Sequence, residues 1–474
     1  MKENKNISSL KSHKFSKGLI QPPMNTLPNS KPVSWTDDRL PEYLWIGLIL
    51  MSFSRTKGIE IAGKILKGIS QINKNLLKPK LSEILSLPNY EQEKIYKTIV
   101  KNVNFKILAP LTVIFKNNDY PIFNKYFYCH EMPTVFRIDT IKKSIKLYYN
   151  HQSYEATDLR FVVLSMMVFQ DKLRVFQGST LPEVFERYPY TSHDDEKMRM
   201  YRPSIRVNEM MDIENLPNKQ FIDFFWKEIG LKTSCNTLVI GFKKEENEMD
   251  YKKYIIDYQY KLNHLITEKK ELVITNDKFN VIIGTITYSL KIFNDVIEKD
   301  LSDSILGRHA YRTILETFIN IKYLLKLEQQ NPNVWLEYKL YGIGKYKLPL
   351  LKERENSIQN NTHFADPLAE VIINEIIWEE FLDIDTRYFD NKKIKEKFEE
   401  VGEKYLYEVL YEYDNNFIHG FWGAVRESSM LHCDNATHKF HSVPDINFEQ
   451  KLSSVNSDIY KIIDKFYNLI EESF

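Results

Sequence analysis

The stretch that decides the fold is Ile305–Lys326, which reads ILGRHAYRTILETFINIKYLLK. Apolar residues recur in it at steps of three and four, the spacing that gives a helix one apolar face. Polar residues recur every four positions and form a second line that drifts slowly around the same helix. The stretch therefore predicts one long helix, with an apolar line of Leu306, Ala310, Ile314, Phe318, Ile321 and Leu325 and a polar line of Arg308, Arg312, Glu316 and Asn320.

The polar line is predicted to lie in a packed interface, because Leu315 and Ile319 lie beside it and a solvated face rarely carries such residues. Charged side chains in a packed interface need partners, since an unpaired buried charge is costly. Two interpretations are open. In one, Arg312 and Glu316 form an i,i+4 pair that supports the helix by about 0.3–0.5 kcal/mol if exposed. In the other, the same residues belong to a functional site.

The rest of the chain predicts a mainly α protein with two helical domains. Residues 1–33 are polar and lack periodicity, so we expect a flexible tail. Residues 34–242 predict a mainly helical N-terminal domain with a few short strands, one of them at Lys143–Tyr149. A charge-dense connector, Lys243–Asp250, separates this domain from residues 251–474. For residues 251–474 we expect an antiparallel helical bundle.

Charge and composition exclude several classes of protein. The chain has 474 residues and a formal net charge of +1, so any contact with nucleic acid would need a local basic patch. Its longest apolar runs are too short to span a bilayer, and its first residues lack an apolar signal core. We therefore expect a cytoplasmic protein with no membrane partner. The richness in Lys, Asn and Ile is typical of proteins from AT-rich bacterial genomes.

Cysteine usage predicts neither a disulfide framework nor a metal site. Only Cys129, Cys235 and Cys433 occur, far apart in the sequence, as expected of a reducing compartment. Cys433, His438 and His441 are residue types that bind zinc, but their spacing matches no standard module and no second ligand pair is evident. We therefore expect no metal there and interpret this stretch as a polar loop that caps the preceding helix. No nucleotide-binding or cofactor motif is present, so no cofactor is predicted.

A second informative stretch is Glu408–Arg426, EVLYEYDNNFIHGFWGAVR, within a single helix predicted over Lys404–Met430. Gly420 and Gly423 are poor helix formers that would leave space for a neighbouring helix or a ligand. A histidine between carboxamides and near a carboxylate can act as an acid or a base near neutral pH. A solvated surface histidine is the plainer alternative. One side of the predicted helix carries Glu412, Asn415, Asn416, His419 and Arg426, and the other carries Phe417, Ile418, Phe421 and Val425.

Together these two helices resemble a bacterial family of helical domains of unknown function allied to the HEPN (higher eukaryotes and prokaryotes nucleotide-binding) superfamily. The resemblance covers roughly Tyr251–Asp445, less than half of the chain. It rests on a helix of the form R-x3-R-x3-E-x3-N-x2-YLL and a later helix of the form Y-x5-HG. The matching residues are Arg308, Arg312, Glu316, Asn320, Tyr323–Leu325, Tyr413, Asn415, His419 and Gly420.

The resemblance implies an α-helical bundle that often dimerises. Active members of the superfamily are metal-independent ribonucleases of phage defence, toxin–antitoxin pairs and abortive infection. Their signature is an Arg, a polar residue, three variable residues and a His. The His serves as general acid and base while the 2′-hydroxyl attacks the adjacent phosphate, and the Arg stabilises the charge that develops. On this chain the His is His419 and the polar residue is Asn415, but Asp414 stands where the Arg is expected.

Two functions follow from the resemblance. In the first, the protein is a defence ribonuclease that acts on RNA, and a facing arginine replaces the charge that is missing at Asp414. In the second, it is a non-catalytic HEPN-like module that binds a partner, a nucleotide or a second copy of the chain as a homodimer. The distance between His419 and the facing arginines would distinguish the two hypotheses. The first implies His419, Arg312, Glu316 and Asn415 as catalytic residues and Arg308, Asn320, Asn416 and Arg426 as substrate-binding residues.

Overall fold

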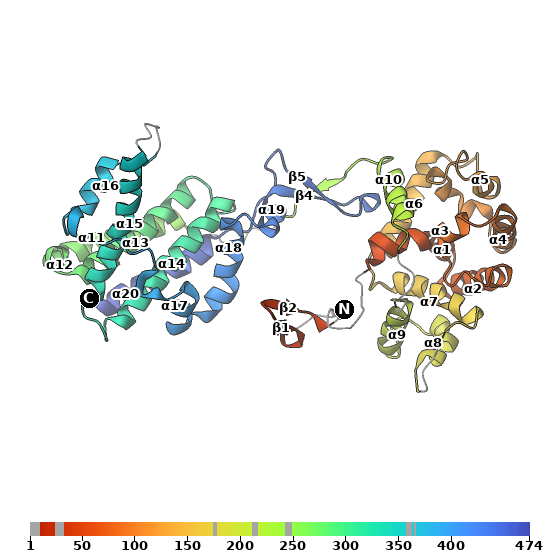
Figure 1. The fold of residues 1–474 in the computed structure, drawn as a ribbon, viewed down its shortest axis with the longest axis horizontal. Helices are drawn as coiled ribbons and strands as arrows, with labels where there is room; N and C mark the ends of the chain where they lie inside the picture. The colour runs from red at the N-terminus through yellow and green to blue at the C-terminus, as the bar shows by residue number, and fades with distance from the viewer. Residues whose placement is uncertain are drawn as a thin grey trace. The chain divides into compact units, whose positions relative to one another are not determined.

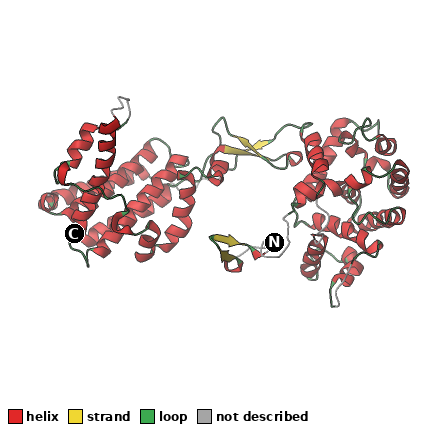
Figure 2. Ribbon diagram, in the orientation of Figure 1, coloured by secondary structure: helices red, strands yellow, loops and turns green. Residues whose placement is uncertain are grey.

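The structure is a computed structural model that describes residues 10–23, 33–173, 178–210, 217–241, 249–356, 363–364 and 366–474. It is mainly α-helical with a few short strands, as the sequence predicts (Figure 2). The chain divides into two compact units. The N-terminal unit comprises Met1–Leu238 and Cys433–His441, and the C-terminal unit comprises Val239–His432 and Ser442–Phe474. No helix in the described ranges is long and apolar enough to cross a bilayer.

The N-terminal unit is built around α1 (Leu40–Met51), which is apolar on nearly every side (Figure 1). Pro41 stands in its first turn, where a missing N–H costs nothing. All but its last two residues are buried, and the Trp45 indole donates to the Pro79 carbonyl at 3.0 Å. The other helices of this unit are η3 (Trp35–Arg39), α2 (Arg55–Ile72), α3 (Leu81–Leu85), α4 (Asn89–Asn102), η4 (Phe105–Ile107), η5 (Ala109–Val113), α5 (Pro121–Phe127), α6 (Thr134–Tyr148), α7 (Tyr154–Phe169), α8 (Leu181–Arg187), η6 (Tyr188–Tyr190), α9 (Met198–Met210), α10 (Lys219–Gly230) and η10 (Ala436–His438).

A buried ion cluster joins three helices of this unit. The Glu209 carboxylate of α9 binds Arg39 of η3 at 2.5 Å and Arg160 of α7 at 2.8 Å. Both guanidinium groups also lie over the Trp35 ring, with their central carbons 5.2 and 5.1 Å from its centroid. The Lys78 ammonium donates to the Glu209 carbonyl at 2.8 Å. Glu209 is fully buried, so the paired arginines compensate a charge that would otherwise be very unfavourable in the core.

The strand predicted at Lys143–Tyr149 is wrong, because that segment continues α6. Its alternation of apolar and polar residues is short enough to fit a helical spacing as well. The apolar residues that the helix buries are Ile141, Ile145 and Tyr148, at steps of four and three. Packing of this apolar face against the core therefore overrides the local strand pattern.

The structure describes part of residues 1–33, the segment predicted to be a flexible tail. This part contains an exposed antiparallel hairpin of β1 (Lys14–Ser16) and β2 (Leu19–Gln21). The two-residue turn between them has positive φ at Lys17 (50°) and Gly18 (79°), which is the conformation of a type I′ turn. Most of the remaining tail lies outside the described residues, and so does most of the predicted connector Lys243–Asp250.

The C-terminal unit is organised around α14 (Ile305–Leu327), the helix predicted from the opening stretch (Figure 1). Ser304 caps it, since its hydroxyl accepts from the Gly307 amide at 3.2 Å. Leu315 and Ile319 are buried together with Ile314, Phe318 and Ile321 of the apolar line, so the helix is packed on more than one side as predicted. Leu306, at the start of that line, is 56% exposed. The other elements of this unit are α11 (Tyr251–Glu268), α12 (Lys270–Thr275), α13 (Asp277–Glu298), α15 (Val334–Asn356), α16 (Asp366–Ile373), η7 (Glu379–Phe381), η8 (Phe389–Asn391), α17 (Ile394–Glu400), η9 (Leu406–Tyr411), α18 (Glu412–Ile418), α19 (Trp422–Ser429), α20 (Asn456–Ser473) and the antiparallel strands β4 (Met430–Cys433) and β5 (Ser442–Pro444).

The single helix predicted over Lys404–Met430 is wrong, because the chain leaves the helix at Gly420. Gly420 has a φ of +60°, and its amide donates to the Phe417 carbonyl at 3.2 Å. The Phe421 amide donates back to the Asn416 carbonyl at 3.0 Å, which completes a Schellman end. The segment therefore consists of η9, α18 and α19. Arg426 belongs to α19 and does not share a helix face with the polar residues of α18.

Candidate functional site

The polar line of α14 faces α18 and the end of η9, so the two informative helices are neighbours as predicted. Arg312 donates to the Tyr411 hydroxyl at 2.5 Å and pairs with Glu316 at 3.3 Å. The Tyr411 hydroxyl in turn donates to Glu316 at 3.3 Å. Burial and then the nearby Glu316 carboxylate raise the pKa of Tyr411 above its usual value, so the phenol stays protonated. Arg312, Glu316 and Tyr411 thus form a closed triangle of contacts within the bundle, in which the buried Nε atom of Arg312 has no hydrogen-bond partner among the described residues.

Arg308 lies one helical turn before Arg312 and is buried. Its hydrogen-bond partners differ from those of Arg312. Its guanidinium donates to the Ser453 carbonyl at 2.7 Å and to the Ser453 hydroxyl at 3.1 Å. It also lies over the rings of Tyr413 and Phe417, with its central carbon 5.6 and 5.8 Å from their centroids. Arg308 thus fixes α18 and the segment before α20 onto α14.

Asp414, which the sequence marked only as a departure from the expected motif, is a buried residue of this interface. Only 2% of it is exposed, and its Oδ1 atom has no hydrogen-bond partner among the described residues. Burial raises the pKa of Asp414 to about 7, although Arg308 and Arg312 oppose that shift. The carboxyl can therefore bind or release a proton near neutral pH. Only its place in the motif, where an arginine was expected, marked it in the sequence.

His419 stands at the C-terminal end of α18. It is exposed, and its ring stacks on Phe421 with 5.4 Å between centroids. Within the described part of the chain, no hydrogen bond or ion pair joins it to Arg308 or Arg312. The composite site of His419 with Arg308 or Arg312 stays a prediction.

The remaining predicted site residues serve local structure. The Asn416 amide donates to the carbonyls of Glu412 and Tyr413 in its own helix. Asn415 contributes its backbone carbonyl, which accepts from the His419 amide at 3.2 Å. Arg426 donates to the Met430 carbonyl at 3.2 Å, and Asn320 is half-buried on α14. None of these contacts orients the His419 imidazole.

The turn between α18 and α19 exposes large aromatic side chains beside His419. Phe421 is 55% exposed and Trp422 is 67% exposed. The surrounding segment, residues 404–429, carries two basic and four acidic residues. One of these acidic residues, Asp414, is buried, so the turn is aromatic and has no excess of basic residues in the sequence around it.

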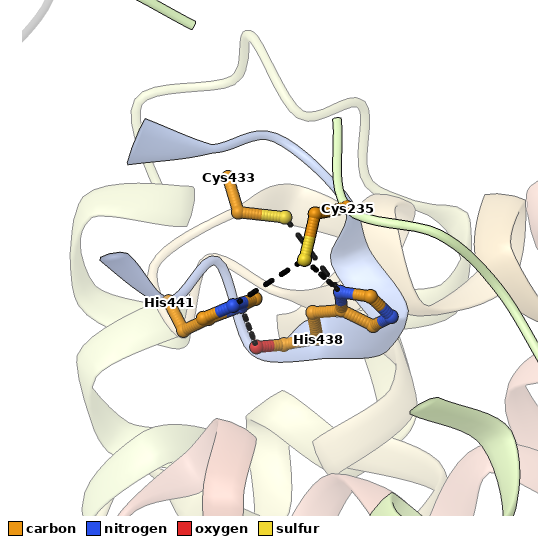
Figure 3. A group of neighbouring side chains, drawn as sticks. All are labelled: Cys235, Cys433, His438 and His441. Atoms are coloured by element: carbon orange, nitrogen blue, oxygen red, sulfur yellow. Dashed lines mark hydrogen bonds between the residues drawn. The ribbon is translucent and has the colours of Figure 1, made fainter. Parts of the chain in front are cut away.

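A second cluster lies in the N-terminal unit, where Cys235 joins Cys433, His438 and His441 (Figure 3). The ligand atoms of the four side chains all lie within 4.8 Å of one another. The expectation of no metal here depended on the lack of a further ligand near Cys433. Cys235 supplies one from a loop almost 200 residues earlier in the chain. No local spacing in the sequence could have found it.

Comparison with known proteins adds one finding for part of the chain. Residues 279–438, about a third of the sequence, match a family of unknown function, DUF5677. No curated protein and no solved structure matches the chain. The matched region contains α14, α18 and the turn at His419, but not Ser453, which binds Arg308.

Proposed function

We propose that the C-terminal unit is a HEPN-like module of bacterial antiphage defence, and that it works by binding a second copy of this chain rather than by cleaving RNA. The observation that carries the choice is that both arginines of the polar line already bind groups of the bundle itself. Each guanidinium is engaged inside the bundle, Arg312 by Tyr411 and Glu316 and Arg308 by the Ser453 segment. The defence role itself rests on the resemblance to the HEPN superfamily.

The aromatic turn supports a protein partner. Exposed aromatic residues are enriched at protein interfaces and often supply most of the binding energy there. Phe421, Trp422 and the neighbouring His419 form such a group on one short turn. The chain carries a net charge of only +1, so two copies would approach without strong repulsion.

The charge around the same turn opposes a nucleic-acid partner. Proteins that bind RNA or single strands combine stacking aromatics with basic residues that contact phosphates. Here Glu408, Glu412 and Glu427 outnumber Lys404 and Arg426 in the sequence around the aromatic pair, and the fourth acidic residue, Asp414, is buried. We therefore favour association of two chains over RNA binding at this surface.

Trp422→Ala is expected to weaken dimer formation at least tenfold, because a central interface tryptophan typically contributes 2 kcal/mol or more. Sedimentation equilibrium of the full-length protein would measure the dissociation constant. Trp378→Ala is the matched control, since Trp378 is 69% exposed but lies in the loop after α16, and it should leave the constant unchanged. A wild type that stays monomeric at about 100 μM, or equal effects of the two substitutions, would contradict the proposal.

The ribonuclease remains a second candidate because one observation favours it. Asp414 titrates near neutral pH within the same helix interface as Arg308 and Arg312, so an ionisable group and two cations lie close together. If RNA cleavage takes place there through His419, His419→Ala and Arg312→Ala should each abolish cleavage and phage protection in a folded protein.

We expect instead that His419→Ala leaves any RNA cleavage unchanged, since His419 makes no polar contact with the arginines. Gel assays of RNA cleavage with purified variants at equal concentration would test this. Loss of folding in Arg312→Ala alone would identify a structural role for the Arg312–Glu316–Tyr411 triangle.

A further inference from the structure

The side-chain cluster in the N-terminal unit joins two segments that are distant in sequence. Cys235 lies in the loop that follows α10, while Cys433 ends β4, His438 ends η10 and His441 follows shortly after (Figure 3). Their thiol and imidazole groups point toward one common centre. Two sulfur and two nitrogen ligands are a complete set for a tetrahedral zinc ion.

The distances between the ligand atoms fit that geometry. The Nδ1 atom of His438 lies 3.4 Å from the sulfur of Cys235 and 3.7 Å from the sulfur of Cys433. The Nε2 atom of His441 lies 3.6 Å from the sulfur of Cys235. A tetrahedral zinc ion with bonds of about 2.3 Å to sulfur and about 2.0 Å to nitrogen holds such atoms about 3.6 Å apart. An ion would therefore fit with no more than small side-chain adjustments.

Both histidines are held in the tautomer that a metal requires. The Nε2 atom of His438 donates to the carbonyl of Gly230 at 3.0 Å, and Nδ1 of His441 donates to the carbonyl of His438 at 3.2 Å. A carbonyl oxygen can only accept, so these nitrogens carry the hydrogens. The other nitrogen of each ring then presents its lone pair to the cysteine sulfurs. Backbone carbonyls orient metal-binding histidines in the same way.

Buried polar contacts hold the two segments in place around the cluster. The Asn435 amide donates to the Ser234 carbonyl at 2.8 Å and to the Thr233 hydroxyl at 3.1 Å. Its oxygen accepts from the Thr437 amide at 3.1 Å. The Asp434 amide donates to the Asn236 carbonyl at 2.8 Å. The ligands thus stand on backbone that is already fixed, which lowers the cost of ordering them around an ion.

We propose that Cys235, Cys433, His438 and His441 bind one zinc ion that fastens the segment Cys433–His441 to the end of α10. Thiolate and imidazole ligands favour zinc over magnesium or calcium, which prefer oxygen. Both cysteines bind as thiolates and release their protons, so their two negative charges balance the ion. Four protein ligands leave no open position, so the role is structural rather than catalytic.

The positions of the ligands in the sequence indicate a structural role for this ion, which would link the two ends of a long chain segment. Val239–His432, the larger segment of the C-terminal unit, lies between Cys235 and Cys433 in sequence. The chain leaves the N-terminal unit shortly after Cys235 and returns to it at Cys433. The ion would link these two points and so close a long loop of the chain. Closure of a long loop by a metal removes much of the conformational freedom of the unfolded chain.

The metal content of the purified full-length protein tests the proposal. Protein prepared with reductant should contain about one zinc ion per chain, as measured by inductively coupled plasma mass spectrometry. His441→Ala and Cys235→Ser, at two exposed positions that leave the core intact, should each lower zinc affinity at least tenfold. Cys129→Ala and His264→Ala change the same residue types outside the cluster and should keep the full zinc content.

Cobalt and hydrogen exchange provide further readouts. Protein stripped with a chelator and titrated with Co²⁺ should develop the visible bands of tetrahedral cobalt bound to thiolates, and both cluster variants should lose them. Chelation should also speed amide exchange in Cys433–His441 and leave that in α14 unchanged. Less than a tenth of an equivalent of zinc with no cobalt bands, equal zinc in wild type and cluster variants, or a disulfide between Cys235 and Cys433 in peptide maps made without reductant would overturn the proposal.

Discussion

Replacing Glu209 by glutamine is expected to lower the free energy of unfolding of the N-terminal unit by about 3–5 kcal/mol. Burial alone would raise the pKa of Glu209, but Arg39 and Arg160 together lower it below its usual value, so the side chain is an anion in the folded chain. Glutamine keeps the shape and removes the charge. Both guanidinium groups then stay against Trp35 without a counter-ion, and their desolvation is no longer compensated.

Hydrogen exchange of the full-length chain at increasing denaturant would measure this loss, because peptides from α1 and α7 report on the N-terminal unit. Glu131→Gln is the matched control. Glu131 also pairs with a cation, Lys106 at 2.7 Å, but its side chain is 77% exposed, so its substitution should leave the stability unchanged. A Glu209→Gln protein as stable as the control would show that the cluster contributes little.

Asp414→Asn is expected to stabilise the C-terminal unit, and to do so increasingly as the pH rises. Burial raises the pKa of Asp414 to about 7, against about 3.9 in an unfolded chain. A carboxyl of this kind favours folding at low pH, where both states are protonated. It opposes folding as the pH rises toward 7, because the unfolded chain releases the proton first. The neutral asparagine removes this penalty, by roughly 2–4 kcal/mol at pH 8.

Urea unfolding of wild type and Asp414→Asn between pH 4 and pH 8 would test the prediction. The two proteins should be nearly equal at pH 4 and diverge across the window up to pH 8. Asp295→Asn is a control on the exposed surface of α13 and should show no such divergence. A difference that does not vary with pH would contradict the raised pKa. The charged groups that influence Asp414 are Arg308 and Arg312 of α14, Asp458 of α20 and Glu427 of α19.

Helix positions were largely predictable because the signal for them is local. The apolar line in Ile305–Lys326 predicted a helix that the structure places at Ile305–Leu327, since three- and four-residue spacing is a property of neighbouring residues. The same reasoning failed at Gly420. Apolar residues continue beyond it on the other side of the break, so the pattern alone did not show where the helix ends.

The spacing of residues along the sequence did not predict which polar side chains contact one another. Arg308 and Arg312 lie one turn apart on α14, yet one binds Ser453 and the other binds Tyr411. These partners depend on how the facing elements are rotated and how far they are shifted along α14. Packing of whole apolar faces sets both quantities, and no single residue encodes them.

The sequence by itself determined that this protein is mainly helical and that one helix carries a buried polar line, because both follow from periodicity along the chain. Only the tertiary structure decided that Arg308 binds Ser453, that Arg312 binds Tyr411, and that Cys235 joins Cys433, His438 and His441. The physical reason is the distance along the chain over which each feature is specified. Hydrophobic spacing acts over a few residues, whereas a composite site depends on segments up to about 200 residues apart that the packed core brings together.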